Sequence, residues 1–171
     1  DSRSIKDKFI GWFKTYEDNI LKFEKDRGLY YAFTSAITSM VKDWNQIHYS
    51  WDQEDIMGKI SNGYWTPLRN LSDGYRGIVH LTADLAYRAI QLNPHLGERA
   101  VIDTEGIVLI DEIDMHLHPK WQRHVIEDLK RTFPKLQFIV TTHSPFIVQS
   151  LRKEEVISLD GDNLYEDPFT K

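Results

Sequence analysis

Apolar residues in the first third of the chain recur three and four positions apart, the spacing that lines one face of an α-helix. The first such set contains Ile5, Phe9, Phe13, Tyr16, Ile20 and Phe23. Gly28 follows this set and is expected to end the helix, because glycine readily takes the left-handed conformation found at helix ends. A second set predicts another helix that reaches about Trp44: Leu29, Phe33, Ile37, Met40 and Val41. Both faces indicate packing surfaces rather than chemistry.

The period of the pattern changes to two between residues 46 and 68. Alternation with polar neighbours predicts a half-buried strand that carries Ile47, Tyr49 and Trp51. A further strand-like run at 56–60 precedes Asn62 and Gly63, a dipeptide that favours a hairpin turn because both residues tolerate positive φ. We therefore expect a small antiparallel ribbon in which residues 64–66 form the returning strand.

From Leu71 onward, helical and strand patterns alternate, which is typical of a parallel α/β sheet. A helix is expected from about Asp73 to Gln91, with a buried side made of Ile78, Leu81, Leu85, Ala89 and Leu92. Short apolar runs predict three strands, the first two buried on both faces: 107–110, 138–140 and 156–159. Two connecting helices are expected, over 146–151 and over 120–133, where four apolar residues lie four apart: Trp121, Val125, Leu129 and Phe133.

Composition and charge narrow the class of protein. Of 171 residues, 41% are hydrophobic and 27% are charged, an ordinary balance for a globular protein. The 21 Lys and Arg against 26 Asp and Glu give a formal charge of −5, so contact with nucleic acid would need a local basic patch. Cysteine is absent, which excludes disulfides and thiolate chemistry. No apolar stretch approaches the ~20 residues that span a bilayer, and no signal-peptide pattern is present, so we expect a cytoplasmic protein without membrane contact.

Two acidic residues directly follow the strand expected over 107–110. Asp111 and Glu112 should emerge at its C-terminal end, which is where open α/β sheets bind ligands. Adjacent carboxylates are unfavourable unless a cation or a proton lies beside them. One carboxylate on Mg²⁺ and the next on a water molecule is the arrangement of a nucleotide hydrolase. The alternative is a strand that simply ends in a polar loop.

Two further features occupy comparable positions. His143 follows the strand at 138–140, so its imidazole could reach the same crevice and hydrogen-bond a phosphate oxygen. Ser72 or Asp73 can cap the helix that begins there, and the free N–H groups of that helix form an anion site. Taken singly, a structural histidine and a plain helix cap are the alternatives.

In this order, these features resemble the motifs of ABC-type ATPases. The segment LSDGY from Leu71 resembles their signature, 107–112 resembles their Walker B strand, and His143 resembles their switch histidine. The segment IDMHLHP from Ile113 is similar to the D-loop of RecF-like and overcoming-lysogenization-defect-like ATPases. The segments LIDEIDMHLHPKWQ and FIVTTHSP resemble those of the AAA-family proteins once labelled "ATP-binding protein involved in virulence", whose relatives include the Septu-type antiphage ATPase PtuA. The resemblance is strong from Leu71 to about Leu151 and weak before it.

The resemblance implies a fold and a set of roles. The fold would be α/β, the C-terminal part of a P-loop ABC-type ATPase head, with a helical segment at 1–45, the antiparallel ribbon at 46–70 and the ATPase lobe at 71–171. ATP would bind with Mg²⁺, which Asp111 would help to hold, largely through water. Glu112 would polarise the attacking water, and His143 would contact the γ-phosphate.

Four more residues would act across a homodimer of heads. Ser72 and Gly74 would reach the γ-phosphate of a nucleotide bound to the opposite protomer, and Asp114 and His118 would lie at the same seam. Two positions depart from the signature of transporters, which has glycine and glutamine there: Asp73 and Tyr75. Asp73 brings a negative charge near a phosphate, so its side chain must turn outward or the contact across the dimer is weakened.

The phosphate loop of these ATPases, G-x-x-x-x-G-K-[ST], does not occur in the sequence. Gly58-Lys59 comes nearest, but Ile60 follows it and Gln53 stands where a glycine is required. In the family this loop lies far upstream, so we expect the chain to be the C-terminal part of a longer ATPase. On its own it should bind ATP poorly and not turn it over.

The same residues are also compatible with metal-binding chemistry. His116 and His118 with Asp111 or Asp114 could ligate a transition metal, and Asp111, Glu112 and Asp114 could form a two-metal nuclease cluster. The chain could also be a non-catalytic assembly module that dimerises or binds a nuclease or nucleic acid.

Partners follow mainly from the resemblance. PtuA-like ATPases pair with an HNH-type nuclease, and some relatives accompany retrons, which implies a nuclease partner in antiphage defence. One helix gathers basic residues that could touch nucleic acid: Lys120, Arg123, Lys130, Arg131 and Lys135. Because Glu127 and Asp128 interleave with them, a solvated face of salt bridges is the favoured interpretation.

Overall fold

The computed structural model describes residues 10–18, 27–115, 117–160 and 163–165. Residues 10–18 are helical. The α-helices and strands that follow are α2 (Gly28–Met40), β1 (Trp44–Ser50), β2 (Asp55–Ile60), β3 (Trp65–Pro67), α3 (Asp73–Leu92), α4 (Ala100–Asp103), β4 (Gly106–Ile110), α5 (Pro119–Gln122), α6 (Val125–Thr132), β5 (Leu136–Val140), α7 (Pro145–Ser150), β6 (Ser158–Asp160) and β7 (Asn163–Tyr165). Short 3-10 turns lie at Leu68–Asn70, Pro94–Arg99 and Lys153–Glu155.

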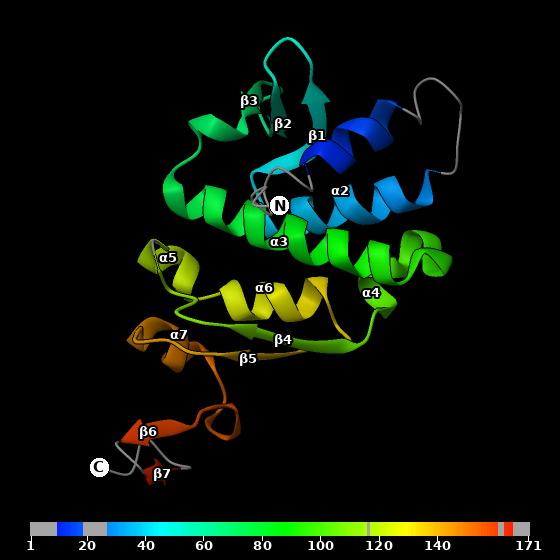
Figure 1. Ribbon diagram of the computed structural model, residues 1–171. Helices are drawn as coiled ribbons and strands as arrows, with labels where there is room; N and C mark the ends of the chain where they lie inside the picture. Colours follow the sequence, from blue (N-terminus) through cyan, green and yellow to red (C-terminus); the bar gives the residue numbers. More distant parts are fainter. Residues whose placement is uncertain (1–9, 19–26, 116, 161–162, 166–171) are drawn as a thin grey trace, which may run out of the picture.

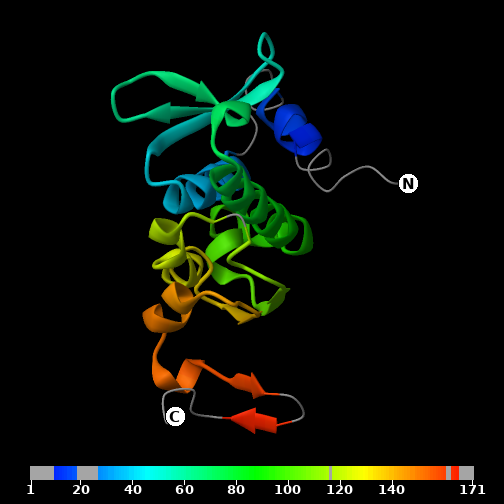
Figure 2. The same ribbon diagram turned by 90° about the vertical axis from the view of Figure 1, so that its left-hand side faces the viewer.

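The long helix α3 crosses the middle of the molecule (Figure 1). The antiparallel ribbon β1–β3 and α2 lie on one side of it, and α6 with the strands β4 and β5 lies on the other. Figure 2 shows that the ribbon and the β6–β7 hairpin lie at opposite ends of the molecule. The α/β class, the parallel strands and the antiparallel ribbon expected from the sequence are therefore confirmed.

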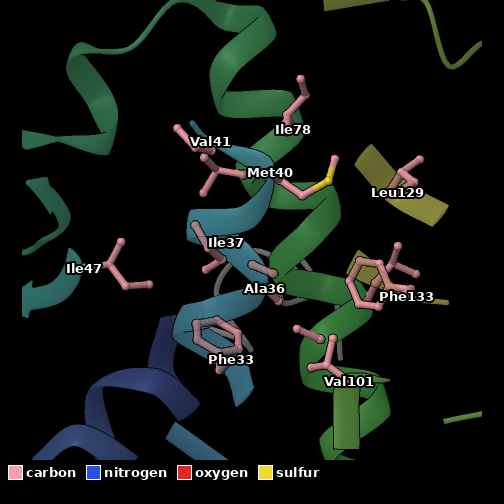
Figure 3. Close-up of a cluster of buried hydrophobic side chains, with 14 of the residues drawn as sticks. Phe33, Ala36, Ile37, Met40, Val41, Ile47, Ile78, Val101, Leu129 and Phe133 are labelled. Atoms are coloured by element: carbon pink, nitrogen blue, oxygen red, sulfur yellow. The ribbon is translucent and has the colours of Figure 1, made fainter. Parts of the chain in front are cut away.

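Helix α2 supplies the centre of the hydrophobic core (Figure 3). Its residues Phe33, Ile37 and Met40 have no exposed surface, because the three- and four-residue spacing places them on one face. Side chains from the ribbon, α3, α4 and α6 pack around them, including Ile47, Ile78, Val101, Leu129 and Phe133. One continuous core thus joins the ribbon to the helices over the parallel strands.

The ribbon has the order β1-β2-β3, with antiparallel pairing throughout. Its β2–β3 turn contains Gly63 with φ of 89°, which confirms the hairpin expected at Asn62-Gly63. Gly58 lies inside β2, opposite Ile47, and a Cβ there would overlap the ring of Trp44. Glycine at this position therefore serves close packing and not phosphate binding, in agreement with the rejection of Gly58-Lys59 as a phosphate loop.

Strands β4 and β5 pair in parallel, with Ile110 opposite Val140. The prediction that both strands are buried on two faces was wrong, because the helices cover one face only (Figure 1). On the other face Ile107 is 66%, Leu109 75% and Ile139 52% exposed. Among the described residues, no element packs against these three side chains.

Two helix boundaries differ from the sequence prediction, and one residue of α3 differs in burial. Gly28 begins α2 and does not show the positive φ of a helix-ending glycine, and α2 stops at Met40, so that Trp44 already belongs to β1. The first predicted helix falls within the described residues only at 10–18. Leu92, expected on the buried side of α3, is 75% exposed at the end of that helix.

The helix predicted over 120–133 is two short helices, α5 and α6, because His124 leaves helical geometry with φ of −136° and ψ of −2°. Its four apolar positions are nevertheless all buried, as expected: Trp121, Val125, Leu129 and Phe133.

The strand predicted over 156–159 is not a third member of the parallel sheet. It corresponds to β6, which pairs antiparallel with β7 in a separate hairpin. Strand β6 has only three residues and buries too little apolar surface to join the parallel sheet. Its backbone hydrogen bonds are made instead with β7, a neighbouring strand of the same length. Whether the three segments 1–45, 46–70 and 71–171 behave as separate units stays a prediction. In the described ranges, no helix is long and apolar enough to cross a membrane.

The packing of Trp44 over Gly58 can be tested by adding one methyl group. We expect Gly58→Ala to lower the free energy of unfolding by about 1–3 kcal/mol, since the added carbon overfills the space beneath the indole ring. Gly77→Ala is the matched control, because a Cβ at that exposed position in α3 meets no atom within 4 Å. It should stabilise the helix by about 0.5–1 kcal/mol. Urea denaturation of both variants measures the difference, and equal midpoints would contradict it.

Candidate functional site

The ends of β4 and β5 place the predicted catalytic residues at one edge of the sheet. The strands are parallel and in register, so residues 111–112 and 141–143 leave them side by side. The pairing continues past the strand ends, where Thr141 N–H donates to the Ile110 carbonyl at 3.0 Å and Ile113 N–H donates to the Thr141 carbonyl at 3.1 Å. Glu112 and His143 therefore emerge at the same end of the sheet, and both are exposed.

Thr141 organises the acidic pair. Its hydroxyl donates to Asp111 Oδ1 at 2.5 Å and accepts a hydrogen bond from the Glu112 N–H at 2.8 Å. The hydroxyl thus fixes one oxygen of Asp111 and leaves the other for water or a cation. Sequence reasoning did not include Thr141 in the candidate site. The available signal was that Thr141 directly follows the apolar run at 138–140, as Asp111 follows the run at 107–110.

Glu112 has a left-handed backbone, with φ of 49°. This conformation costs a residue with a Cβ of the order of 1 kcal/mol or more, and such strain gathers at functional sites. The flanking hydrogen bonds to Thr141 hold the turn in place. The strain is explained if the carboxylate must project from the sheet edge at this point.

Asp114 ties the loop after β4 to the loop after β5. Its Oδ1 accepts hydrogen bonds from the Thr142 hydroxyl at 2.5 Å and from the His143 N–H at 3.2 Å. Burial alone would raise the pKa of Asp114, but hydrogen bonds from Thr142 and from backbone N–H groups, with the His143 imidazole nearby, hold it below its ordinary value. An ionised Asp114 therefore orients the segment that carries His143.

A second group of predicted residues lines a separate pocket of about 610 Å³. Ser72, Gly74 and His118 share it with Asp73, Tyr75, Leu117, Lys120 and Trp121. Ser72 caps α3, with Oγ 3.5 Å from the Tyr75 nitrogen, and the Nδ1 of His118 accepts from the Lys120 N–H at 3.2 Å. The predicted residues thus divide into this pocket and the sheet-edge cluster of Asp111, Glu112, Asp114 and His143.

The two unusual signature residues both have partners within the chain. Asp73 is exposed and forms an ion pair with Arg76, which neutralises its charge at the pocket. The Tyr75 hydroxyl donates to Asp43 at 2.6 Å, while its ring packs edge-on against Trp121 with centroids 4.5 Å apart. Burial, followed by the hydrogen bond to Asp43 and its charge, raises the pKa of Tyr75 to about 12. Tyr75 therefore fastens the signature helix to its neighbours.

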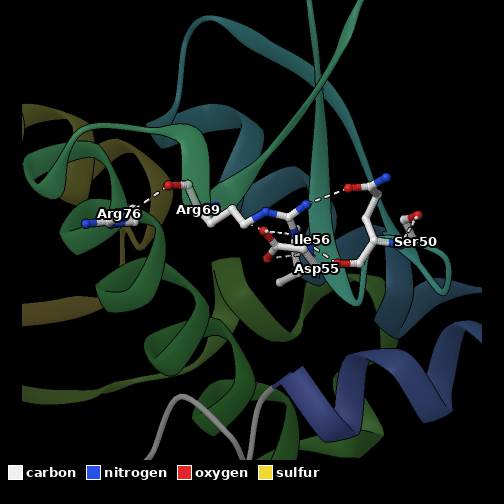
Figure 4. A network of polar contacts seen from close by, with 6 residues as sticks. Ser50, Asp55, Ile56, Arg69 and Arg76 are labelled. Carbon is white, nitrogen blue, oxygen red and sulfur yellow. Dashed lines mark hydrogen bonds and ion pairs between the residues drawn. The ribbon is translucent and has the colours of Figure 1, made fainter.

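Arg69 anchors the start of the signature helix to the ribbon (Figure 4). Its carbonyl accepts from Arg76 at 3.0 Å, and its guanidinium donates to the Gln53 carbonyl at 2.8 Å and lies 3.5 Å from Asp55. The ribbon thereby fixes the position of the pocket wall that contains Ser72.

The contacts of the described residues do not support the transition-metal site, the two-metal nuclease cluster or the basic nucleic-acid surface that the sequence also allowed. Across the described ranges, no group of three or more His, Asp or Glu side chains could hold a metal ion, and His116 lies outside them. Three of the basic residues around α6 form salt bridges, one with the interleaved Asp128 and two with acids from other segments. Arg131 lies 2.6 Å from Asp128, Lys130 2.5 Å from Glu155 and Lys135 3.2 Å from Asp103.

Solved structures with the same fold are ATPase heads. A structure from work on "ATP-driven dimerization and DNA stimulated activation of SMC ATPases" matches with a TM-score of 0.55 at 16% identity, covering 91% of this chain and 86% of that one. The parallel strands and the helices over them therefore share the fold of this SMC structure.

The chain belongs to the family described as "AAA domain, putative AbiEii toxin, Type IV TA system", whose model matches residues 5–149. It is 40% identical over 121 residues to "Retron Vc95 probable ATPase" of Vibrio cholerae serotype O1 biovar El Tor, covering 71% of this chain and 23% of that protein. It is also 40% identical over 123 residues to "Septu protein PtuA" of Bacillus mycoides (strain KBAB4), covering 72% and 16%. The chain thus spans less than a quarter of these relatives.

Backbone strain at Glu112 predicts an unusual order of stabilities. We expect Glu112→Gly to be more stable than Glu112→Ala by up to about 1 kcal/mol, because both remove the carboxylate but only glycine removes the Cβ from a left-handed residue. At the exposed Glu105, which has no positive φ, the same pair of substitutions should give the opposite order. Urea denaturation of the four variants measures both differences. A more stable alanine variant at residue 112 would contradict the strain.

Proposed function

We propose that this chain supplies the Walker B strand, switch histidine, D-loop and signature of an ATPase head that hydrolyses ATP as a dimer. The observation that carries the proposal is the in-register pairing of β4 with β5, which brings Glu112 and His143 to one sheet edge. The chain's family and its ATPase-head fold support the same activity.

In this proposal the sheet-edge residues act on the nucleotide bound to their own head. Glu112 orients and polarises the attacking water, and His143 offsets charge that develops on the γ-phosphate. Asp111 fits the donor set of Mg²⁺, an oxygen-binding cation usually held partly through water, and Thr141 orients one of its oxygens. Bound Mg²⁺ would neutralise phosphate charge.

The signature pocket would act on the nucleotide of the second head. Ser72, Gly74 and His118 line a pocket that Asp111, Glu112 and His143 do not share, which suits a contact made in trans. Asp114 lies in the loop between the two groups. The name of the SMC structure, which refers to ATP-driven dimerization, supports a homodimer closed by ATP.

The phosphate loop would come from residues other than these 171. The sequence lacks that motif, and the apolar face of Ile107, Leu109 and Ile139 suits burial by further strands or helices. The retron and Septu names of two relatives support a role in antiphage defence. The HNH-type nuclease partner and the contact with nucleic acid rest on the resemblance of the motifs and stay predictions.

Nucleotide binding by the chain alone tests its dependence on the phosphate loop. We expect no saturable binding of a fluorescent ATP analogue at micromolar concentrations, because the loop's backbone amides and lysine supply much of the affinity. The same titration on the protein that includes the loop is the control. Micromolar affinity of the 171-residue chain would contradict the expectation.

Glu112→Gln in the ATPase with its phosphate loop tests the proposed function itself. The amide keeps the shape of the side chain but cannot polarise water, so hydrolysis should fall at least a hundredfold while ATP-dependent dimers persist. Phosphate release measures turnover, and light scattering measures dimers. Unchanged turnover would overturn the assignment of Glu112. Dimers formed by a wild-type protein that hydrolyses no ATP would favour the non-catalytic assembly module.

A further inference from the structure

Gln122 is the last residue of α5 and lies between the two groups of predicted residues. Its Nε2 donates to the Leu117 carbonyl at 2.8 Å and to the Asp114 carbonyl at 3.4 Å. Its Oε1 accepts from the Ser144 hydroxyl at 2.7 Å. One half-buried amide thus holds the loop before His118 and the residue that follows His143.

The hydrogen bonds around Gln122 close into a ring. Ser144, which is only 5% exposed, donates its N–H to the Thr142 hydroxyl at 3.0 Å. Thr142 in turn donates to Asp114 Oδ1 at 2.5 Å, and the Asp114 carbonyl returns to Gln122. The orientation of the Gln122 amide follows from its partners, because two carbonyl oxygens face one of its atoms and can only accept, so that atom is the nitrogen. The Gln122 oxygen is then left to accept from the Ser144 hydroxyl. A closed polar ring of this kind holds both loops in one relative position.

Helix α5 connects this ring to the signature pocket. His118 caps its first turn and Gln122 ends it, so a displacement of one end moves the other. The buried Trp121 between them packs against Tyr75 of the signature helix. A movement caused by a contact at the pocket can therefore be transmitted to Ser144 through the single turn of α5.

We propose that Gln122 is a positioning residue that couples the signature pocket to His143. The inference rests on the proposed function and adds a regulatory link to it: docking of a second head on the pocket sets the position of His143 through α5, Gln122 and Ser144. An amide is required because it donates to carbonyls at one atom and accepts a hydroxyl at the other. Neither a carboxylate nor an apolar side chain does both.

The test uses the ATPase with its phosphate loop in place. Gln122→Leu, which removes both contacts, should lower kcat at least tenfold and leave KM for ATP within about twofold, because a misplaced catalytic group loses rate more than binding. Gln91→Leu, at an exposed position of α3, is the matched control and should keep the wild-type kcat. Unfolding midpoints are measured for every variant.

Gln122→Glu separates positioning from a merely structural role. At pH 8 the introduced carboxylate faces the Leu117 carbonyl and kcat should fall at least tenfold. Towards pH 6 a protonated carboxyl donates to Leu117 and accepts from Ser144, so the ratio of variant to wild-type kcat should rise at least threefold. Gln91→Glu should show a constant ratio.

Each outcome has a distinct meaning. Wild-type kcat in Gln122→Leu, or no recovery of Gln122→Glu at low pH, overturns the coupling. If the leucine variant does not fold, the pH profile of the glutamate variant decides alone. Turnover that survives Glu112→Gln overturns the proposed function and this inference together. Turnover abolished by Glu112→Gln but retained in Gln122→Leu overturns the inference only.

Discussion

The parallel, in-register pairing of β4 with β5 is the constraint on which the rest of the site depends. Because Ile110 lies opposite Val140, everything that follows each strand is brought to one sheet edge. A shift of the register by one residue would separate Thr141 from Asp111 and turn alternate side chains to the other face. On one side the strands pack against the core, in which Met40 of α2, Leu129 of α6 and Phe133 directly after α6 have no exposed surface.

The two faces of the β4–β5 sheet differ in how much of their apolar surface is exposed to solvent. The inner face packs against the core through partly buried side chains such as Val108 and Phe138, and the outer face leaves Leu109 and Ile107 largely exposed. At the strand ends, polar contacts replace apolar packing: Thr141 orients the acidic pair, Asp114 holds the loop of His143, and Gln122 joins that loop to α5. Apolar packing on one side and the hydrogen-bond ring at the strand ends together fix the positions of the proposed catalytic residues.

The local pattern of apolar and polar residues was sufficient to predict most helices and strands and the residues that lie together at the sheet edge. The period of three to four residues located α2 and α3, the period of two and Asn62-Gly63 located the ribbon, and short apolar runs located β4 and β5. Motif spacing identified Asp111, Glu112 and His143, because strand ends are visible in the sequence as the point where an apolar run meets polar residues. These features depend on neighbours close in the chain, which is why they could be predicted.

The sequence by itself therefore determined the elements and the residue types at their ends. Tertiary structure decided which face of β4 is covered, which partner β6 takes, and that Gly28 begins a helix, since each depends on distant residues. It also decided the left-handed backbone of Glu112 and the hydrogen bonds of Thr141 and Gln122. These features arise where segments 22 to 29 residues apart in the chain meet. A pattern within one segment contains no information about its contacts with the other.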